Sequence, residues 1–347
     1  MVVSTGASGY IKYAYEGDTF GTVAGGAQTL TTNTGKKFGL QDRITTWTLS
    51  NNRINLAALS QTELENFAYG TQNGSLSVDF VLSNPWILGS LYGAPDSGSG
   101  SGHKTHTYSK STTAGSTKKV RTFQTEVGYD TQVSGSNKDI IRTMKGCIMR
   151  TLNITATIGG TVDCSADIGY AKEDAPTLAF ASSGVFDNHL PSKPTSEFPY
   201  TFAHATLKVN NVELAKIQDI DLTFNQNPDL LFEVGSHQAV DAYRRIFEVT
   251  GRFRASWVNK DMLEHTLNQI SAGTAGTYSE TLDSSAPYLE VVFQKDSNEE
   301  IKVTLTGIAP TDFSISGFEP VEPVFEDITW QAKSAVIVAK NSETSEE

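Results

Sequence analysis

Apolar and polar residues alternate along several stretches of this chain. In GSLSVDFVL (residues 74–82), Leu76, Val78, Phe80 and Leu82 occupy alternate positions, and the polar positions between them are Ser75, Ser77 and Asp79. A period of two is typical of a β-strand that buries one face and exposes the other. The same alternation recurs in residues 46–50, 148–158, 162–170, 219–225 and 248–257. The sequence therefore predicts long strands, each with one apolar and one polar face.

The polar positions of these strands are rich in Thr, Ser, Asp and Asn. In the first half of the chain they are Thr46, Thr48, Ser50, Ser77, Asp79, Thr151, Asn153, Thr155, Asp163, Ser165 and Asp167. In the second half they are Asp219, Asp221, Thr223, Asn225, Glu248, Thr250, Arg252 and Arg254. Two interpretations are open: the solvent face of an ordinary β-sandwich, or the wall of a water-filled channel.

The stretch GCIMRTLNITATIGGTVDCSADIGYAK contains two alternating runs around a Gly-Gly pair, which predicts a β-hairpin. Directly opposed residues share a face, so both apolar sets coincide only if opposed residue numbers have an even sum. Ile158 opposite Val162 satisfies this, and it places Cys164 opposite Ala156. Cys147 falls on the other face, so we expect no bond between the two cysteines. A bond between chains stays open.

Capping signals predict a few short helices between the strands. Ser60 is a candidate N-cap, Glu63 completes a capping box, and Gly70 marks a helix end. In NPWILGSLYG, Asn is the candidate cap and Pro occupies the first helical position. The helices expected on such grounds are residues 60–70, 84–93 and 259–270. A fourth helix is expected at residues 236–247, where Ala239, Tyr243 and Ile246 follow one another at spacings of four and three.

The same order of elements occurs twice: strand, helix, strand, Asn-capped helix, TYS, strands and a final hairpin. Phe80 and Phe253 are 173 residues apart, as are Leu49 and Leu222, and the two TYS triplets are 170 apart. A repeated order at this scale predicts an internal duplication. The expected units are an N-terminal arm (1–40), a first module (41–190), a second module (191–340) and a disordered acidic tail (341–347).

Composition and charge narrow the possible classes of protein. The 347 residues are 38% hydrophobic and 19% charged, which with the strand pattern favours an all-β protein with a few short helices. The net charge of −12 argues against a surface that wraps DNA by neutralising phosphates. Two cysteines are too few for a disulfide framework. We expect no signal peptide, because MVVSTGASGYIKYAYEGD has no apolar core of the required length. We expect no membrane segment, because no apolar run approaches about 20 residues.

No stretch carries a convincing catalytic signature. GSGSG lacks the Lys and the following helix of a phosphate-binding loop. His103 and His106 have no evident third ligand, and Asp219 and Asp221 are better interpreted as a solvated strand face than as a cation site. Cys147 has no neighbouring His to activate it. The sequence therefore predicts a protein that is not an enzyme and has no cofactor and no metal site.

Several stretches, in this order and spacing, resemble the tail tube (major tail) proteins of tailed bacterial and archaeal viruses. They are EGDTFGT, NGSLSVDFVLSNPWILGSLYG, HKTHTYS, KGCIMRTLNITATIGGTVDCSADIGYAK, IQDIDLTFNQN and EVGSHQAVDAYRRIFEVTGRF, and together they cover most of residues 16–340. The resemblance implies β-sandwich modules with a flanking helix, whose long strands form part of a ring-shaped inner β-barrel. Rings of modules stack into a hollow tail tube that conducts double-stranded DNA from the capsid to the host.

The resemblance also implies partners and a location. With two modules per chain, three chains make a ring with pseudo-sixfold symmetry; without a duplication, six chains are expected. Tape-measure and tail-terminator proteins are further partners. The protein is made in the host cytoplasm and resides in the virion, and DNA passes without specific binding. The polar faces then line the lumen, since a Thr, Ser, Asn and Asp wall does not retain phosphates.

Two other functions fit the same strands. One is a β-sandwich adhesin or carbohydrate-binding surface protein, which usually exposes aromatic residues on its binding face. Trp47, Trp257 and Trp330 lie among apolar positions here, which favours the core. The other is a tail-completion or baseplate ring protein of the same fold. Electron microscopy separates the three, as tubes, discrete particles or rings that do not extend.

Overall fold

The computed structural model describes most of the strands and turns of the chain. The described residues are 9–17, 20–21, 30, 35–56, 66–68, 70–93, 96–97, 103–109, 120–129, 140–173, 197–209, 212–213, 217–256, 289–317 and 324–341. The helix expected at 259–270, Trp257, the second TYS triplet and most of the acidic tail fall outside them.

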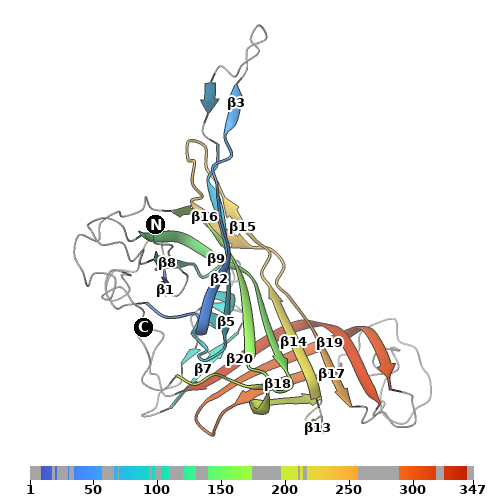
Figure 1. Ribbon diagram of the computed structural model, residues 1–347. Helices are drawn as coiled ribbons and strands as arrows, with labels where there is room; N and C mark the ends of the chain where they lie inside the picture. Colours follow the sequence, from blue (N-terminus) through green and yellow to red (C-terminus); the bar gives the residue numbers. More distant parts are fainter. Residues whose placement is uncertain are drawn as a thin grey trace, which may run out of the picture.

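One large antiparallel sheet dominates the molecule, and it confirms the all-β prediction (Figure 1). Eight strands form its central part, in the spatial order β2 (Leu40–Ser50), β5 (Asn73–Val81), β10 (Val162–Tyr170), β9 (Ile140–Thr157), β14 (Ile217–Asn225), β17 (Glu248–Ser256), β20 (Phe325–Asn341) and β19 (Glu300–Ser316), reading from the β2 edge. The sheet therefore runs without a break across the boundary expected near residue 190.

Shorter strands extend this sheet at both ends. Beyond β19 lie β18 (Leu289–Gln294), β12 (Ala205–Val209) and β13 (Val212–Glu213). The first half of β9 pairs with β8 (Phe123–Tyr129) and β11 (Lys172–Glu173), and β8 pairs with β1 (Gly9–Tyr15). The end of β20 pairs with β7 (Lys104–Tyr108), which pairs with β6 (Asp96–Ser97).

Two small hairpins and three short helical turns complete the described structure. The hairpins are β3 (Ile54–Leu56) with β4 (Asn66–Ala68), and β15 (Pro228–Leu231) with β16 (Asp241–Arg244). The helical turns are η2 (Trp86–Leu88), α1 (Gly89–Tyr92) and η4 (Phe202–His204). Figure 1 shows the β3–β4 hairpin projecting beyond the end of the sheet, with β15 and β16 near its base.

The two halves of the sheet have the same pairing pattern. In the first half, β1, β8, β9, β10, β5 and β2 pair in this order; in the second half, β12, β18, β19, β20, β17 and β14 do. The halves meet where β14 pairs with β9, and β7 of the first half also pairs with β20 of the second.

The long strands β9 and β19 bend at corresponding glycines. Gly146 has φ +62° and Gly307 has φ +65°, a region that side chains other than glycine rarely enter. Four residues later each strand carries a β-bulge, which leaves Arg150 and Thr311 outside the register with β10 and β20. After the bend each strand leaves its first partner, β8 or β18. β9 then pairs with β10 and β14, while β19 pairs with β20 along its whole length.

The apolar positions of all eight central strands lie on one side and form a continuous core. Phe80, Leu152, Leu222, Phe253 and Trp330 are each 3% exposed or less. Because the cluster includes residues from both halves, the two halves share one core.

Among the expected helices, only residues 84–93 are confirmed. There the side-chain oxygen of Asn84 accepts a hydrogen bond from the Trp86 N–H at 3.2 Å, and the Pro-led turn continues into α1. The other two expectations that the structure tests are wrong. Residues 66–68 form strand β4, while Ser60 and Glu63 lie outside the described residues.

Residues 236–247 contain strand β16 instead of a helix. Ala242 is buried against β15 and Arg244 is buried beside it, whereas Ile246 is 68% exposed. The helical spacing of Ala239, Tyr243 and Ile246 therefore does not mark a buried face, and pairing with β15 determines the local structure.

The 146–172 hairpin has the predicted parity but a different register. Val162 lies opposite Ala156, and Cys164 lies opposite Ile154, so the expected partners are wrong by two residues. The loop is longer than the expected three residues, because residues 157–161 all lie between the paired Ala156 and Val162. Within this loop the Gly160 N–H donates a hydrogen bond to the Thr157 carbonyl at 2.9 Å. Both cysteines are free and buried.

Candidate functional site

The polar positions of both halves lie on a single face of the central sheet. One row of directly opposed residues runs Ser165, Asn153, Thr223, Thr250 and Gln331, across β10, β9, β14, β17 and β20. Opposed residues in neighbouring strands point to the same side. The row therefore crosses from the first half to the second without changing face, and we call this side the polar face.

The remaining residues singled out from the sequence join the polar face through their own pairs. A second row of opposed residues consists of Asp163, Thr155, Asp221 and Arg252, and a third consists of Ser77, Asp167, Thr151, Asn225 and Glu248. The remaining opposed pairs are Asp219 with Arg254, Asp79 with Ser165, Thr46 with Ser77, Thr48 with Ser75, and Ser50 with Asn73. All of these side chains are exposed or half-exposed.

Other residues of the polar face were missed in the sequence. Asp327, Thr329 and Gln331 alternate with buried residues along β20, so their signal was present in EDITWQA. Arg43 was hidden for a physical reason. A bulge between Ile44 and Thr46 inserts one extra residue into β2. Odd-numbered residues before the bulge, such as Arg43, therefore lie on the same face as even-numbered residues after it.

Arg252 is the centre of a charged cluster on the polar face. Its Nε donates to Asp327 Oδ1 at 2.7 Å, and a second guanidinium nitrogen donates to the other oxygen of the same carboxylate. Its Nη1 lies 3.4 Å from Asp219 Oδ1 and 3.8 Å from Asp221 Oδ2. The hydrogen bond to Asp327 raises the pKa of Arg252. Burial raises the pKa of Asp219, and Arg252 opposes that shift.

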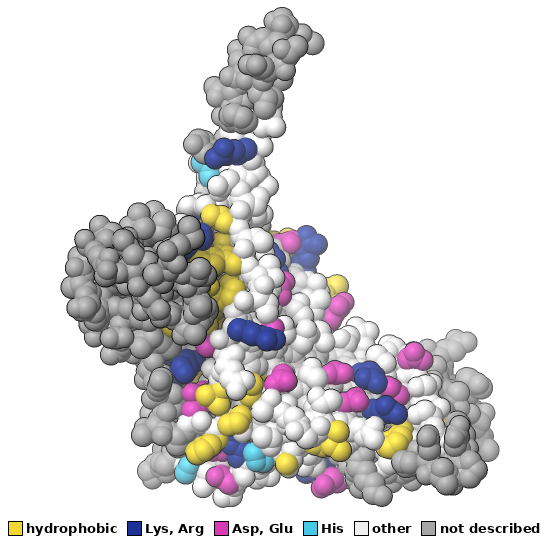
Figure 2. All heavy atoms as spheres, viewed as in Figure 1, with side chains coloured by type: hydrophobic (Ala, Val, Ile, Leu, Met, Phe, Trp, Pro, Cys, Tyr) yellow, Lys and Arg dark blue, Asp and Glu magenta, His cyan; other side chains and the backbone are white. Residues whose placement is uncertain are grey.

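The other arginines of this face also have partners. Arg43 pairs with Asp79 at 3.1 Å, and the guanidinium of Arg254 lies 5.0 Å from the centre of the Phe325 ring. In Figure 2, acidic and basic side chains lie interspersed among uncharged ones over the region of β14 and β17. Arg43, Arg252 and Arg254 are therefore already engaged within the protein, which weakens their attraction for an external anion.

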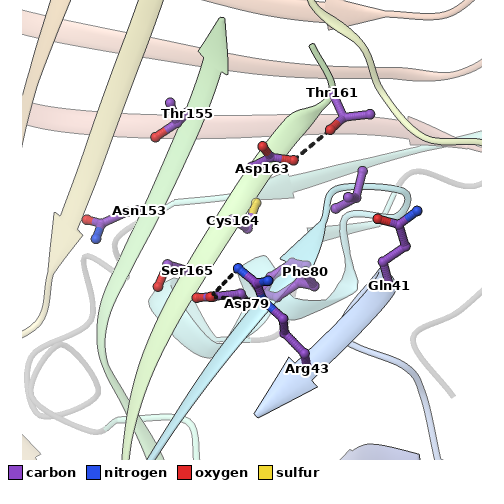
Figure 3. A pocket seen from close by; sticks show the side chains of 11 residues that line it. Gln41, Arg43, Asp79, Phe80, Asn153, Thr155, Thr161, Asp163, Cys164 and Ser165 are labelled. Carbon is purple, nitrogen blue, oxygen red and sulfur yellow. Dashed lines mark hydrogen bonds and ion pairs between the residues drawn. The ribbon is translucent and has the colours of Figure 1, made fainter. Parts of the chain in front are cut away.

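A hollow of about 600 Å³ lies on the polar face between β2, β5, β10 and β9 (Figure 3). Asp79 and Asp163 line it, each bonded to a neighbour: Asp79 to Arg43, and Asp163 to the Thr161 hydroxyl at 2.7 Å. Asn153 and Thr155 project toward it from β9. The charged groups that line the hollow are therefore paired within the protein.

The chemistry-bearing residues considered from the sequence do not converge. Within the described ranges, no group of three or more His, Cys, Asp and Glu residues could hold a metal ion. His106 is buried and its Nε2 lies 3.2 Å from Asn341 Oδ1. Burial raises the pKa of the Cys147 thiol. In the same ranges, no helix is long and apolar enough to cross a membrane.

A model of the phage tail tube protein family matches residues 6–332. The match spans nearly the whole chain and both halves of the sheet. The chain belongs to the phage tail tube protein family. A search of the curated proteins found no match.

Membership of this family identifies a structural protein of the virion tail. The tryptophans that the structure of this tail tube protein describes agree with a structural use. Trp86 and Trp330 are buried in the core, and Trp47 lies under Arg142, 4.0 Å from the guanidinium carbon, with its Nε1 donating to the Tyr170 hydroxyl at 3.1 Å. The extended polar face is then the surface whose role within a tube has to be explained.

Proposed function

We propose that this protein assembles as stacked rings into the hollow tube of the tail, with the polar face lining the channel for double-stranded DNA. The observation that carries the proposal is the unbroken polar face itself, which spans eight strands from both halves of the chain. A continuous core covers the opposite side of those strands. A sheet of this kind can close into a barrel with water inside and hydrophobic packing outside.

Three chains per ring are supported by the pairing pattern. Each half contributes four central strands in the same order, and the halves meet strand to strand. We therefore propose that each half is one tube module, so that three chains give six modules. With eight strands per chain, such a ring has twenty-four strands. Porins of about 16–18 strands already enclose an aqueous channel, and diameter grows with strand number.

The electrostatics of the polar face suit the passage of DNA. Aspartates outnumber arginines there, and Arg252 is held by Asp327, Asp219 and Asp221. An exposed arginine attracts phosphates and releases counterions, which slows a moving duplex. An arginine that is already paired with carboxylates attracts a passing phosphate less strongly.

Apolar side chains at both ends of the central strands support stacking of the rings. Ile54 is 54% exposed and Val234 fully exposed, on the segments that project beyond one end of the sheet. Ile158, in the turn at the opposite end of β9, is 67% exposed. Stacking would cover these side chains. Tape-measure and tail-terminator proteins are the further partners that we expect in the virion, after synthesis in the host cytoplasm.

Electron microscopy of the purified protein tests the proposal. We expect hollow tubes that lengthen with protein concentration, and cross-sections with three chains and pseudo-sixfold symmetry. Rings that never extend would favour a tail-completion or baseplate role. Discrete particles would favour a surface-binding protein and would contradict the proposal. Rings with strict sixfold symmetry, made of six chains, would contradict two modules per chain.

A further inference from the structure

The central sheet ends in two edges that have different sequences. One edge is β2, which pairs with β5 on its inner side. The other is the second half of β19, where residues 309–316 pair with β20, while β18 reaches only residues 300–305. Within the described part of the chain, no strand covers the outer side of either edge. Edges of this length are templates for pairing with another chain.

The joint between the two halves shows how such edges are covered. There β14 pairs antiparallel with the second half of β9, and Leu152, Ile154, Leu222 and Phe224 are at most 1% exposed. At the open edges the corresponding side of each strand is incompletely covered. Leu49 on β2 is 38% exposed, and Ile315 on β19 is half-exposed. The edges therefore lack the packing that the same positions have at the joint.

The rungs of the sheet relate the open edges to the joint. We call a row of directly opposed residues across neighbouring strands a rung. In the first half, the rung that starts at the residue after the β9 bulge is Thr151, Asp167, Ser77 and Thr46. In the second half, the rung that starts at the residue after the β19 bulge is Asp312, Thr329, Arg252 and Asp221. Thr46 on β2 therefore corresponds to Asp221 on β14.

The joint then fixes a register for the open edges. Asp221 lies opposite Thr155, four residues after Thr151. The residue four places after Asp312 on β19 is Ser316. Transferring the joint to the edges thus places Thr46 opposite Ser316.

We propose that β2 of one chain adds antiparallel to residues 312–316 of β19 in the next chain of the ring, in the register of the β14–β9 joint. Trp47 then lies opposite Ile315, Thr48 opposite Ser314, and Leu49 opposite Phe313. This proposal rests on the proposed function, because it names the contact that closes the ring.

The transferred register makes chemical sense at every rung. Apolar side chains of β2 meet apolar side chains of β19 on the core side, and Thr and Ser meet on the polar face. Leu49 and Ile315 gain the cover that Phe224 and Ile154 have at the joint. The contact is head-to-tail, so it makes a closed ring when the rotation per chain is a whole fraction of a turn. The polar face then continues around the ring without a break.

An engineered disulfide tests this register. At the joint, the Ile158 N–H donates to the Gln218 carbonyl at 2.9 Å, so Ile158 and Gln218 occupy a hydrogen-bonded rung. Hydrogen-bonded and non-hydrogen-bonded pairs alternate along an antiparallel ladder. Asn153 and Thr223, five residues along the ladder from Ile158 and Gln218, therefore form a non-hydrogen-bonded pair, in which the side chains are closer. Thr48 and Ser314 are their counterparts, with Cβ atoms expected about 4.5 Å apart, which a disulfide tolerates. The two natural cysteines are buried.

The experiment assembles the Thr48→Cys, Ser314→Cys double variant under reducing conditions and then oxidises it. We expect chains linked into dimers and trimers, at a yield at least about tenfold above a Thr48→Cys, Ser165→Cys control, because a disulfide needs close Cβ atoms. Ser165 is exposed on the same face but lies two strands inward. A Thr48→Cys, Ser316→Cys variant, offset by two residues, should link less than the matched pair.

The outcomes separate this proposal from the proposed function. Tubes that form but link no better than the control would overturn the joint and leave the tube intact. Better linkage of the offset pair would overturn the register. Absence of tubes from the unsubstituted chain would overturn both proposals. If the double variant assembles poorly, mixing the two single variants gives the same test, with linked pairs expected between the two kinds of chain.

Discussion

Arg252 on β17 and Asp327 on β20 are joined by two hydrogen bonds across neighbouring strands, so the guanidinium faces a carboxylate of its own sheet. This relationship explains how a basic residue can lie on the polar face without acting as a phosphate site. Replacing the carboxylate should change that.

Asp327→Asn is expected to make assembled tubes retain short duplex DNA at low salt. The substitution removes the bidentate partner of Arg252, which leaves the guanidinium with two longer contacts to Asp219 and Asp221. Each freed arginine can neutralise a phosphate, so the log–log salt slope of retention should steepen by about 0.9 per contact. Co-sedimentation of DNA with tubes over a salt series measures this.

The matched control for this experiment is Asp163→Asn. It removes one negative charge from the same face, but Asp163 bonds to Thr161 rather than to an arginine. Equal retention by the two variants would show that net charge alone, and not the engagement of Arg252, governs the interaction with DNA.

Leu49→Asp is expected to block assembly and leave the folded monomer intact. The Leu49 side chain lies on the core side of the open β2 edge and is 38% exposed, so a charge there opposes pairing with another chain but still reaches solvent in the monomer. Urea unfolding should stay within about 0.5 kcal/mol of the unsubstituted chain, as for most surface changes. Light scattering measures assembly, and Ser165→Asp should still assemble. Normal tubes from Leu49→Asp would argue against β2 as a contact strand.

Glu326→Gln is expected to flatten the dependence of stability on pH. Burial raises the pKa of Glu326 to about 7 from its usual 4.5, so the folded chain holds this proton more tightly than the unfolded chain does. The corresponding stability is fully present below pH 4.5 and is lost as pH rises through about 7. At pH 8 the variant should be more stable by up to about 3 kcal/mol, and near pH 4.5 the two should agree.

Urea unfolding of unassembled chains at several pH values checks this expectation. A smaller slope of the same sign should remain, because burial also raises the pKa of Asp42 to about 6. Glu248→Gln, at a half-exposed position of the polar face, serves as the control. A variant that parallels the unsubstituted chain at every pH would exclude Glu326 as the source of the slope.

Gly146→Ala is expected to destabilise the chain by more than Gly159→Ala. Both glycines have positive φ, which costs a side chain about 1 kcal/mol or more. At Gly146 an added Cβ would also lie 2.7 Å from the Phe20 ring and 2.9 Å from Ala171, whereas at Gly159 it would meet nothing within 4 Å. The difference in unfolding free energy between the two variants reports the crowding at the β9 bend. Equal losses would mean that backbone conformation alone matters there.

The alternating pattern predicted the strands and their faces well, because burial of one face is a local property of a strand. The polar residues of the segments 77–79, 151–155 and 219–225 all lie on the face that their alternation indicated. What the pattern could not supply was non-local. The helical spacing in residues 236–247 competed with a period-two reading of DAYR, and the partner strand β15 decided between them.

Bulges and turns limited the remaining predictions. The bulge in β2 concealed Arg43, and the wider turn at Gly160 shifted the hairpin by two residues. The spacing of the two halves is affected in the same way. Rungs traced from the two bulges relate Leu222 to Trp47, not to Leu49 as the sequence spacing had indicated. Register depends on such single-residue insertions, which leave little trace in composition or periodicity.

The proposed channel depends most on the direction in which the polar face points. A cryo-electron microscopy map of the assembled tube measures this directly. We predict that Asn153, Thr223 and Thr250 point toward the tube axis, in rings of three chains whose sheets join into one barrel. A map in which these residues face the outer surface, or are buried between neighbouring chains, would contradict the proposed channel.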